Sequence, residues 1–165
     1  MTFKRCFPPV VDARTRVLIL GSLPGEASLA QQRYYAHKQN KFWRLVGDVI
    51  ERDLVGMDYA TRLETLLENR IGLWDVVAEA QRVGSLDSRI RNHVRNDLIA
   101  LVEPLPNLVA IAFNGGAAAK IGERAFGEMA SRYQLVRLPS SSPAHAAVPY
   151  VEKLVAWRKL RCYLK

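Results

Sequence analysis

The sequence has few cysteines and no long apolar run. Its two cysteines, Cys6 and Cys162, lie near opposite ends of 165 residues, which excludes a four-cysteine zinc or iron–sulfur site and leaves two reduced thiols as the expectation. No stretch approaches the ~20 consecutive apolar residues that a membrane-spanning helix needs, and no secretory signal is seen at the N-terminus. We therefore expect a cytoplasmic protein that makes no contact with a membrane.

Several sequence signatures of catalysis are also missing. The three histidines show no metal-ligand spacing, so we expect no metal site and no cofactor. The glycine-rich turn Gly21-Ser22-Leu23-Pro24-Gly25 lacks the Lys-Ser/Thr ending of a P-loop and the spacing of a dinucleotide fingerprint. No Gly-x-Ser-x-Gly elbow is present, which argues against an α/β hydrolase.

The sequence does have an excess of positive charge. Lys and Arg number 24 against 16 Asp and Glu, a net charge of +8. Basic side chains replace the counterions around phosphates, so this excess favours a polyanionic partner. One polar stretch, from Gln81 to Asn96, contains a single acid and four arginines: Arg82, Arg89, Arg91 and Arg95. We expect this stretch, and Arg89 and Arg91 in particular, to follow a phosphate backbone.

The order of apolar and polar segments predicts one α/β domain over residues 1–165. Short apolar runs that end in turn residues predict strands at 17–20, 71–77, 108–113 and 133–138. Helices are predicted at 42–54, 59–68, 96–101 and 149–164, and another follows residue 116. Strands that alternate with helices imply crossover connections, hence a three-layer α/β/α sandwich with a central, mostly parallel sheet.

Loops rich in Gly, Ser, Pro and Asn follow three of the predicted strands, and the fourth ends near Asp75. The loops are Gly21–Gly25, Asn114–Gly116 and Pro139–Pro143. In an open parallel sheet the ligand binds beyond the carboxyl ends of the strands. We therefore expect these loops to meet at one edge of the sheet and to form the functional site.

The segment before the first long helix carries aromatic, histidine and asparagine side chains. It reads Tyr34-Tyr35-Ala36-His37-Lys38-Gln39-Asn40-Lys41-Phe42-Trp43. Phe42 and Trp43 fit the apolar face of the helix, and an asparagine at position 40 can cap it. Tyr34 and Tyr35 lie outside the helical pattern, and an aromatic face in a loop suits stacking on a base.

Taken together, these motifs resemble the uracil-DNA glycosylase superfamily. Its mismatch-specific uracil/thymine branch has a Gly-x-Asn-Pro-Gly turn and an aromatic-Ala-His-Pro-x-Asn-x-Phe-Trp segment, which are similar to Gly21–Gly25 and Tyr35–Trp43 here. The superfamily's His/Asn-Pro-Ser motif, which precedes a loop that enters DNA, is similar to Leu138-Pro139-Ser140-Ser141-Ser142-Pro143-Ala144-His145. Leu23 and Leu138 stand where most branches have polar catalytic residues. In these features the chain is most similar to the hypoxanthine-DNA (deoxyinosine) glycosylase branch.

The resemblance implies a monofunctional DNA glycosylase that flips a deaminated base, hypoxanthine first, out of double-stranded DNA and hydrolyses its N-glycosidic bond. It assigns catalysis to Asn40, whose carboxamide would place the attacking water. Base binding would fall to Gly21, Ser22, Leu23, Tyr35 and Asp75. Contacts with DNA would fall to Ser140, Ser141, Ser142, Ala144 and His145. We expect the protein to act as a monomer.

Two other functions fit the same residues. A uracil or thymine mismatch glycosylase would use the same pocket. A DNA-binding relative that has lost catalysis would also show leucines at positions 23 and 138. Individual residues have structural interpretations as well. For Asp75, a helix cap and a base-reading role carry equal weight, and the serines alone could form an ordinary turn. His37 is expected to fix its own loop through a hydrogen bond with a backbone group.

Overall fold

The core of the protein is a four-stranded parallel sheet. The computed structural model describes residues 3–82, 84–87 and 90–165. The strands follow the order β3-β2-β6-β7, with bounds β2 (Val17–Gly21), β3 (Ile71–Asp75), β6 (Ala110–Asn114) and β7 (Gln134–Leu138). Gly21 pairs with Asp75 and Asn114 pairs with Leu138, so the carboxyl ends of the strands lie together at one edge. The predicted parallel sheet is confirmed.

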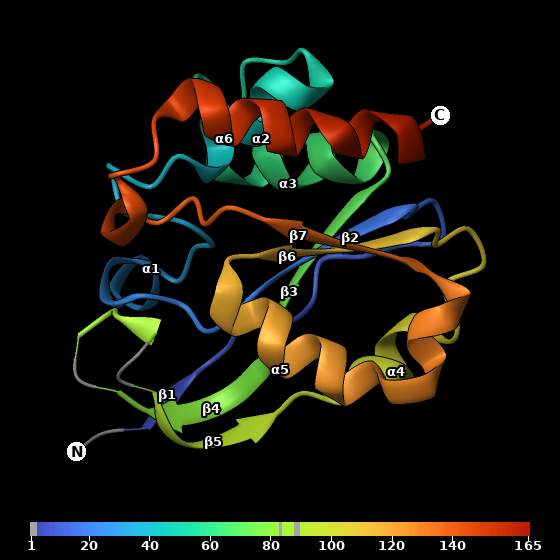
Figure 1. Ribbon diagram of the computed structural model, residues 1–165. Coiled ribbons are helices and arrows are strands. Elements are labelled where there is room, and N and C mark those ends of the chain that lie inside the picture. Colours follow the sequence, from blue (N-terminus) through green and yellow to red (C-terminus); the bar gives the residue numbers. More distant parts are fainter. Residues whose placement is uncertain (1–2, 83, 88–89) are drawn as a thin grey trace.

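Helices cover both faces of this sheet (Figure 1). One face carries α2 (Phe42–Ile50), α3 (Tyr59–Glu68) and α6 (Tyr150–Trp157), and the other carries α4 (Leu98–Val102) and α5 (Gly116–Phe126). Side chains alternate along a strand, so Val17 and Ile19 enter the first core while Leu18 and Leu20 enter the second. The three-layer sandwich is therefore confirmed.

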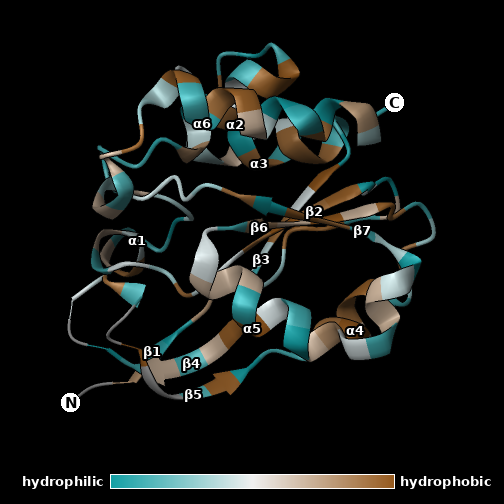
Figure 2. Cartoon of the chain, in the orientation of Figure 1, coloured by the Kyte–Doolittle hydropathy of each residue, from teal (hydrophilic) through white to brown (hydrophobic). Residues whose placement is uncertain are grey.

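Hydropathy follows this arrangement (Figure 2). The central strands are largely hydrophobic, because helices bury both of their faces, whereas the helices carry hydrophobic and hydrophilic residues in turn. Helix boundaries differ from the sequence prediction in two places. Helix α2 ends at Ile50, not residue 54, since Glu51 adopts a φ of 59° and the chain turns back. Helix α6 gives way at Arg158 to the 3₁₀ helix η4 (Arg158–Tyr163).

A small antiparallel sheet was not predicted from the sequence. It pairs β1 (Phe3–Arg5), β4 (Val77–Gln81) and β5 (Arg91–Arg95) in the order β1-β4-β5. Strand β4 ends at Gln81, where the arginine-rich stretch begins, and β5 contains its Arg91 and Arg95. Arg82 is 2% exposed and donates hydrogen bonds to backbone carbonyls, so its proposed place along a phosphate backbone is wrong. Arg89 lies outside the described residues, and the backbone of Arg91 lies in β5.

The remaining elements are short. They are α1 (Glu26–Gln31), η2 (Gly127–Arg132) and η3 (Pro143–His145). Helix α1 follows the glycine-rich turn, and η3 follows the serine loop, so both lie near the carboxyl edge of the sheet (Figure 1). Within the described ranges, no helix combines the length and the apolar character required to cross a membrane.

Candidate functional site

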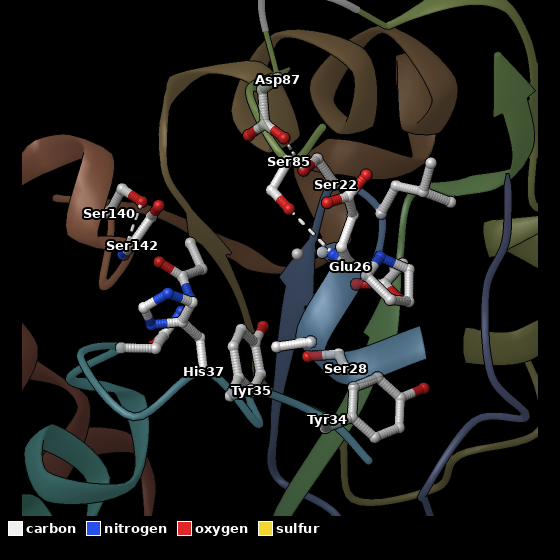
Figure 3. A pocket seen from close by; sticks show the side chains of 18 of the residues that line it. Ser22, Glu26, Ser28, Tyr34, Tyr35, His37, Ser85, Asp87, Ser140 and Ser142 are labelled. Carbon is white, nitrogen blue, oxygen red and sulfur yellow. Dashed lines mark hydrogen bonds between the residues drawn. The ribbon is translucent and has the colours of Figure 1, made fainter. Parts of the chain in front are cut away.

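A pocket opens at the carboxyl ends of the parallel strands (Figure 3). Residues from every predicted loop line it: the turn Gly21–Gly25, the segment before α2, Asp75, Asn114 and the serine loop. The predicted meeting of these loops at one edge is confirmed. Among the described residues, the lining also includes the acids Glu26 and Asp87 and no lysine or arginine. The pocket is therefore acidic, although the protein as a whole carries a net charge of +8.

Two polar groups without partners form the floor of this pocket. Asp75 is 3% exposed, and both its Oδ2 atom and the Tyr35 hydroxyl are buried with no hydrogen-bond partner among the described residues. Both groups lie against Gly21, because a Cβ there would lie 2.7 Å from Asp75 Oδ1 and 2.8 Å from the Tyr35 hydroxyl oxygen. Unpaired buried polar groups are rare and costly in folded proteins. The floor is therefore suited to pair with the polar edge of a ligand.

Burial changes the acidity of this floor. Desolvation, together with the nearby charge of Asp87, raises the pKa of Asp75 to about 7, while the charge of Arg82 opposes this rise. The interpretation of Asp75 as a helix cap is wrong, since strand β4 and not a helix follows it. A buried carboxyl group whose pKa lies near neutral pH is typical of a functional site.

The two adjacent tyrosines have different environments. Tyr34 lines the pocket but is buried, and its hydroxyl donates to the carbonyl of Pro8 at 2.9 Å, which argues against the predicted stacking role. The backbone of Tyr35 adopts a φ of 54°, a left-handed conformation that is rare for residues other than glycine. Its ring stacks on Phe42 with centroids 3.8 Å apart and planes 16° apart, and it lines the pocket. Phe42 thus supports the Tyr35 ring from behind.

Asn40 lines the same pocket. Its Oδ1 atom accepts a hydrogen bond from the backbone N–H of Phe42 at 2.9 Å, which supports the first turn of α2. Its Nδ2 group has no partner among the described residues. Next to it, His37 Nδ1 accepts from the N–H of Gln39 at 3.1 Å, and the His37 carbonyl accepts from the N–H of Asn40 at 2.9 Å. The expectation that His37 fixes its own loop is confirmed.

Asn114 holds the serine loop against the sheet. Its Nδ2 donates to Ser141 Oγ and its Oδ1 accepts from the Ser141 N–H, both at 2.9 Å. The Ser141 carbonyl accepts from the N–H of Lys41 at 3.0 Å. Ser141 is 1% exposed, which argues against the predicted phosphate contact through its side chain and indicates a positioning role. The one sequence feature that indicated a role for Asn114 is its place as a polar residue at the end of a buried strand.

The other residues of the predicted DNA-contacting loop are more accessible. Ser140 and Ser142 line the pocket, and Ser142 Oγ accepts from the N–H of Ala144 at 3.2 Å. Ala144 and His145 are exposed in η3, so they form the outer tip of the loop. This arrangement fits the predicted contacts with DNA, which stay predictions.

The connection between β4 and β5 forms a further wall of the pocket, which sequence reasoning missed. Ser22 Oγ donates to Asp87 Oδ1 at 2.6 Å, and the N–H of Glu26 donates to Ser85 Oγ at 2.9 Å. The buried guanidinium of Arg82 donates to the carbonyls of Leu23 and Pro24. These bonds hold the glycine-rich turn, and thereby Ser22 and Leu23, in place along the pocket (Figure 3).

Comparison with known proteins agrees with this geometry. The sequence profile of the Uracil DNA glycosylase superfamily matches residues 8–161. Proteins named hypoxanthine DNA glycosylase from Methanosarcina barkeri and Methanosarcina acetivorans are 44% and 46% identical over 142 residues, which cover 86% of this chain and 88% of each relative. A solution NMR structure of a uracil DNA glycosylase candidate from Methanosarcina acetivorans superimposes with a TM-score of 0.87 at 42% identity and covers 99% of both chains. This chain therefore belongs to the uracil DNA glycosylase superfamily.

Proposed function

We propose that this protein is a monofunctional DNA repair glycosylase that removes hypoxanthine from double-stranded DNA and leaves an abasic site. The observation that carries the proposal is the pocket floor, where Asp75 Oδ2 and the Tyr35 hydroxyl are buried with no hydrogen-bond partner within 3.5 Å among the described residues, beside an aromatic ring. The 44% and 46% identical relatives named hypoxanthine DNA glycosylase support the choice of base. The protein acts as a monomer on one flipped nucleotide at a time.

Recognition of the base follows from hydrogen-bond complementarity. Hypoxanthine presents an N1–H donor next to an O6 acceptor. The Asp75 carboxylate accepts from N1–H, since an ionised carboxylate can only accept. The carbonyls of Gly21 and Ser22 already accept from the N–H groups of Val76 and Val77, so they do not compete with Asp75 for N1–H. We assign the O6 acceptor to a backbone N–H group of this turn, which lines the pocket. The free face of the Tyr35 ring stacks on the base, and its hydroxyl completes the polar floor.

Hydrolysis of the bond leaves positive charge on the sugar and negative charge on the departing base. Asn40 orients the attacking water through its carboxamide. The acidic lining, Glu26 and Asp87 with Asp75 below them, favours the positive charge that develops on the sugar. No lysine lines this pocket in the described part of the chain, which supports hydrolysis by water without a Schiff base and without strand cleavage.

A panel of duplexes tests this function. Each labelled duplex holds one hypoxanthine, uracil, xanthine or normal base, and alkali converts abasic sites into strand breaks. We expect breaks at hypoxanthine after alkali and none before it, because the enzyme removes the base but leaves the backbone intact. Release from uracil alone would favour the mismatch glycosylase instead. Binding of the hypoxanthine duplex without release of any base would identify a catalytically inactive relative.

Gly21→Ala tests the floor itself. The added Cβ would lie 2.7 Å from Asp75 Oδ1 and 2.8 Å from the Tyr35 hydroxyl oxygen, so both groups must move away from the base. We expect single-turnover excision of hypoxanthine to fall about tenfold, since overpacking of this kind costs roughly 1–3 kcal/mol. Gly116→Ala is the matched control, because a Cβ there meets no atom within 4 Å. Equal effects of the two substitutions would contradict the role of the floor.

A further inference from the structure

A second cavity lies beside the base pocket, between the segment before α2 and the segment before α6. Figure 1 shows these two segments side by side, in cyan and in orange to red. The cavity is lined by Gln39, Lys41, Ser142, Pro143, Ala146, Val148, Pro149, Tyr150 and Lys153. Ser142 and Pro143 line both cavities, so the second one adjoins the place where a flipped nucleotide would enter.

Lys153 is the unusual residue of this cavity. It is 2% exposed, and its ammonium group makes no hydrogen bond and no ion pair with the described residues, yet its Nζ atom is not fully enclosed. The aliphatic stem is therefore buried while the charged end still reaches the cavity, where it has no partner among the described residues. Burial and the charge of Lys41 both lower the pKa of Lys153. A second lysine thus adds to the cost of this charge, and no acid among the described lining residues offsets it.

The remaining lining groups also favour an anion. Ser142 contributes a hydroxyl group and Gln39 a carboxamide. Helix α6 begins at Tyr150, so the positive end of its dipole lies at the cavity as well. Two ammonium groups, a hydroxyl and a helix N-terminus form the kind of site that holds a phosphate group.

We propose that this cavity binds a backbone phosphate of the DNA next to the flipped nucleotide, with Lys153 and Lys41 as its cationic ligands. The inference rests on the proposed function only in taking DNA as the ligand. The bound phosphate supplies the counter-charge that Lys153 lacks in the free protein. It also fixes the serine loop, since Ser142 belongs to both cavities.

Binding of a duplex with a stable abasic-site analogue, measured by fluorescence anisotropy over a series of salt concentrations, tests this site. Lys153→Met and Lys41→Met remove the charge and keep an apolar stem, and Lys159→Met, at an exposed lysine of η4, is the control of equal charge. We expect Lys153→Met to weaken binding about tenfold, as for other charged hydrogen bonds. The slope of log K against log salt should become shallower by about 0.9, because the variant neutralises one phosphate fewer. Lys159→Met should change neither quantity appreciably.

Thermal unfolding of the free protein separates this role from a structural one. Lys153→Met should leave the Tm unchanged or raise it, because it removes a partly desolvated charge that has no partner among the described residues. A lower Tm together with an unchanged salt slope would overturn the proposal. Stabilisation of the wild type by inorganic phosphate as large as by the duplex would also overturn it, in favour of a site for free anions. If the protein released no base but Lys153→Met still made the salt dependence of duplex binding shallower, the proposed function would be contradicted and the phosphate site would stand.

Discussion

Asn40→Ala is expected to slow the excision of hypoxanthine by about 100- to 1,000-fold, the size of effect seen when a single preorganised polar group is removed from a hydrolytic site. Asn40 is the carboxamide of the segment before α2 that lines the pocket, and its Nδ2 group has no partner among the described residues. The loss should appear in the single-turnover rate, while the affinity for a duplex with a stable abasic-site analogue should stay close to that of the wild type.

A structural contribution of Asn40 must be separated from this effect. Its Oδ1 atom also supports the first turn of α2 through the N–H of Phe42, and removal of such a hydrogen bond costs about 1 kcal/mol of stability. Asp58→Ala is the matched control, since Asp58 caps α3 by accepting from the N–H of Thr61 at 2.8 Å, away from the pocket. Asn40→Ser keeps a side-chain acceptor but cannot reach as far. Full activity of Asn40→Ser would mean that Asn40 acts through the helix and not on the water.

The parallel sheet could be predicted from the sequence because its two central strands are apolar runs that end in turn residues. Val17–Gly21 and Ala110–Asn114 are buried along their whole length, and burial on both faces leaves a continuous apolar signature. The antiparallel sheet could not be predicted in this way. Strand β5 carries arginine, asparagine and histidine, its Val94 is exposed, and its pairing with β4 shifts register twice.

The site was predicted in outline but not in its details. The sequence brought Gly21, Asp75 and the serine loop to one edge, because strand ends of a parallel sheet must meet there, and the family resemblance added Asn40. It could not distinguish Tyr34 from Tyr35, since their environments differ through the left-handed backbone of Tyr35. The sequence also predicted that Arg82 contacts DNA, because charged side chains are usually exposed. Burial of its guanidinium depends on carbonyls of the turn after β2, far away in the sequence.

The second large effect concerns pH and Asp75. Because the pKa of Asp75 is raised from 3.8 to about 7 in the folded protein, the fold keeps its full stability below pH 3.8, where the carboxyl group is protonated in both states, and loses stability progressively up to about pH 7. At about 1.4 kcal/mol per pH unit, the loss amounts to up to about 4 kcal/mol. Asp75→Asn removes this titration. Urea unfolding should therefore show equal stability of the two proteins near pH 4 and a more stable variant at pH 8.

Excision should follow the opposite trend. If the ionised Asp75 accepts N1–H of hypoxanthine, the single-turnover rate of the wild type should rise with pH up to about 7 and then level off. Asp75→Asn should be slower at pH 8, because a neutral carboxamide accepts more weakly, and should lack this rise. A rise of the same size in Asp75→Asn would assign the titration to another group.

A second substitution tests the cause of the shift. The charge of Asp87 raises the pKa of Asp75, and Arg82 lowers it. The other titratable groups whose charges couple to Asp75 are Cys6, Tyr34 and Tyr35, and burial raises the pKa of each of them. Asp87→Asn should therefore move the rise in excision rate to lower pH. Ser22→Ala, which removes the hydrogen bond to Asp87 but keeps its charge, should move it less. A rise that stays in place in Asp87→Asn would mean that burial alone sets the acidity of the pocket floor.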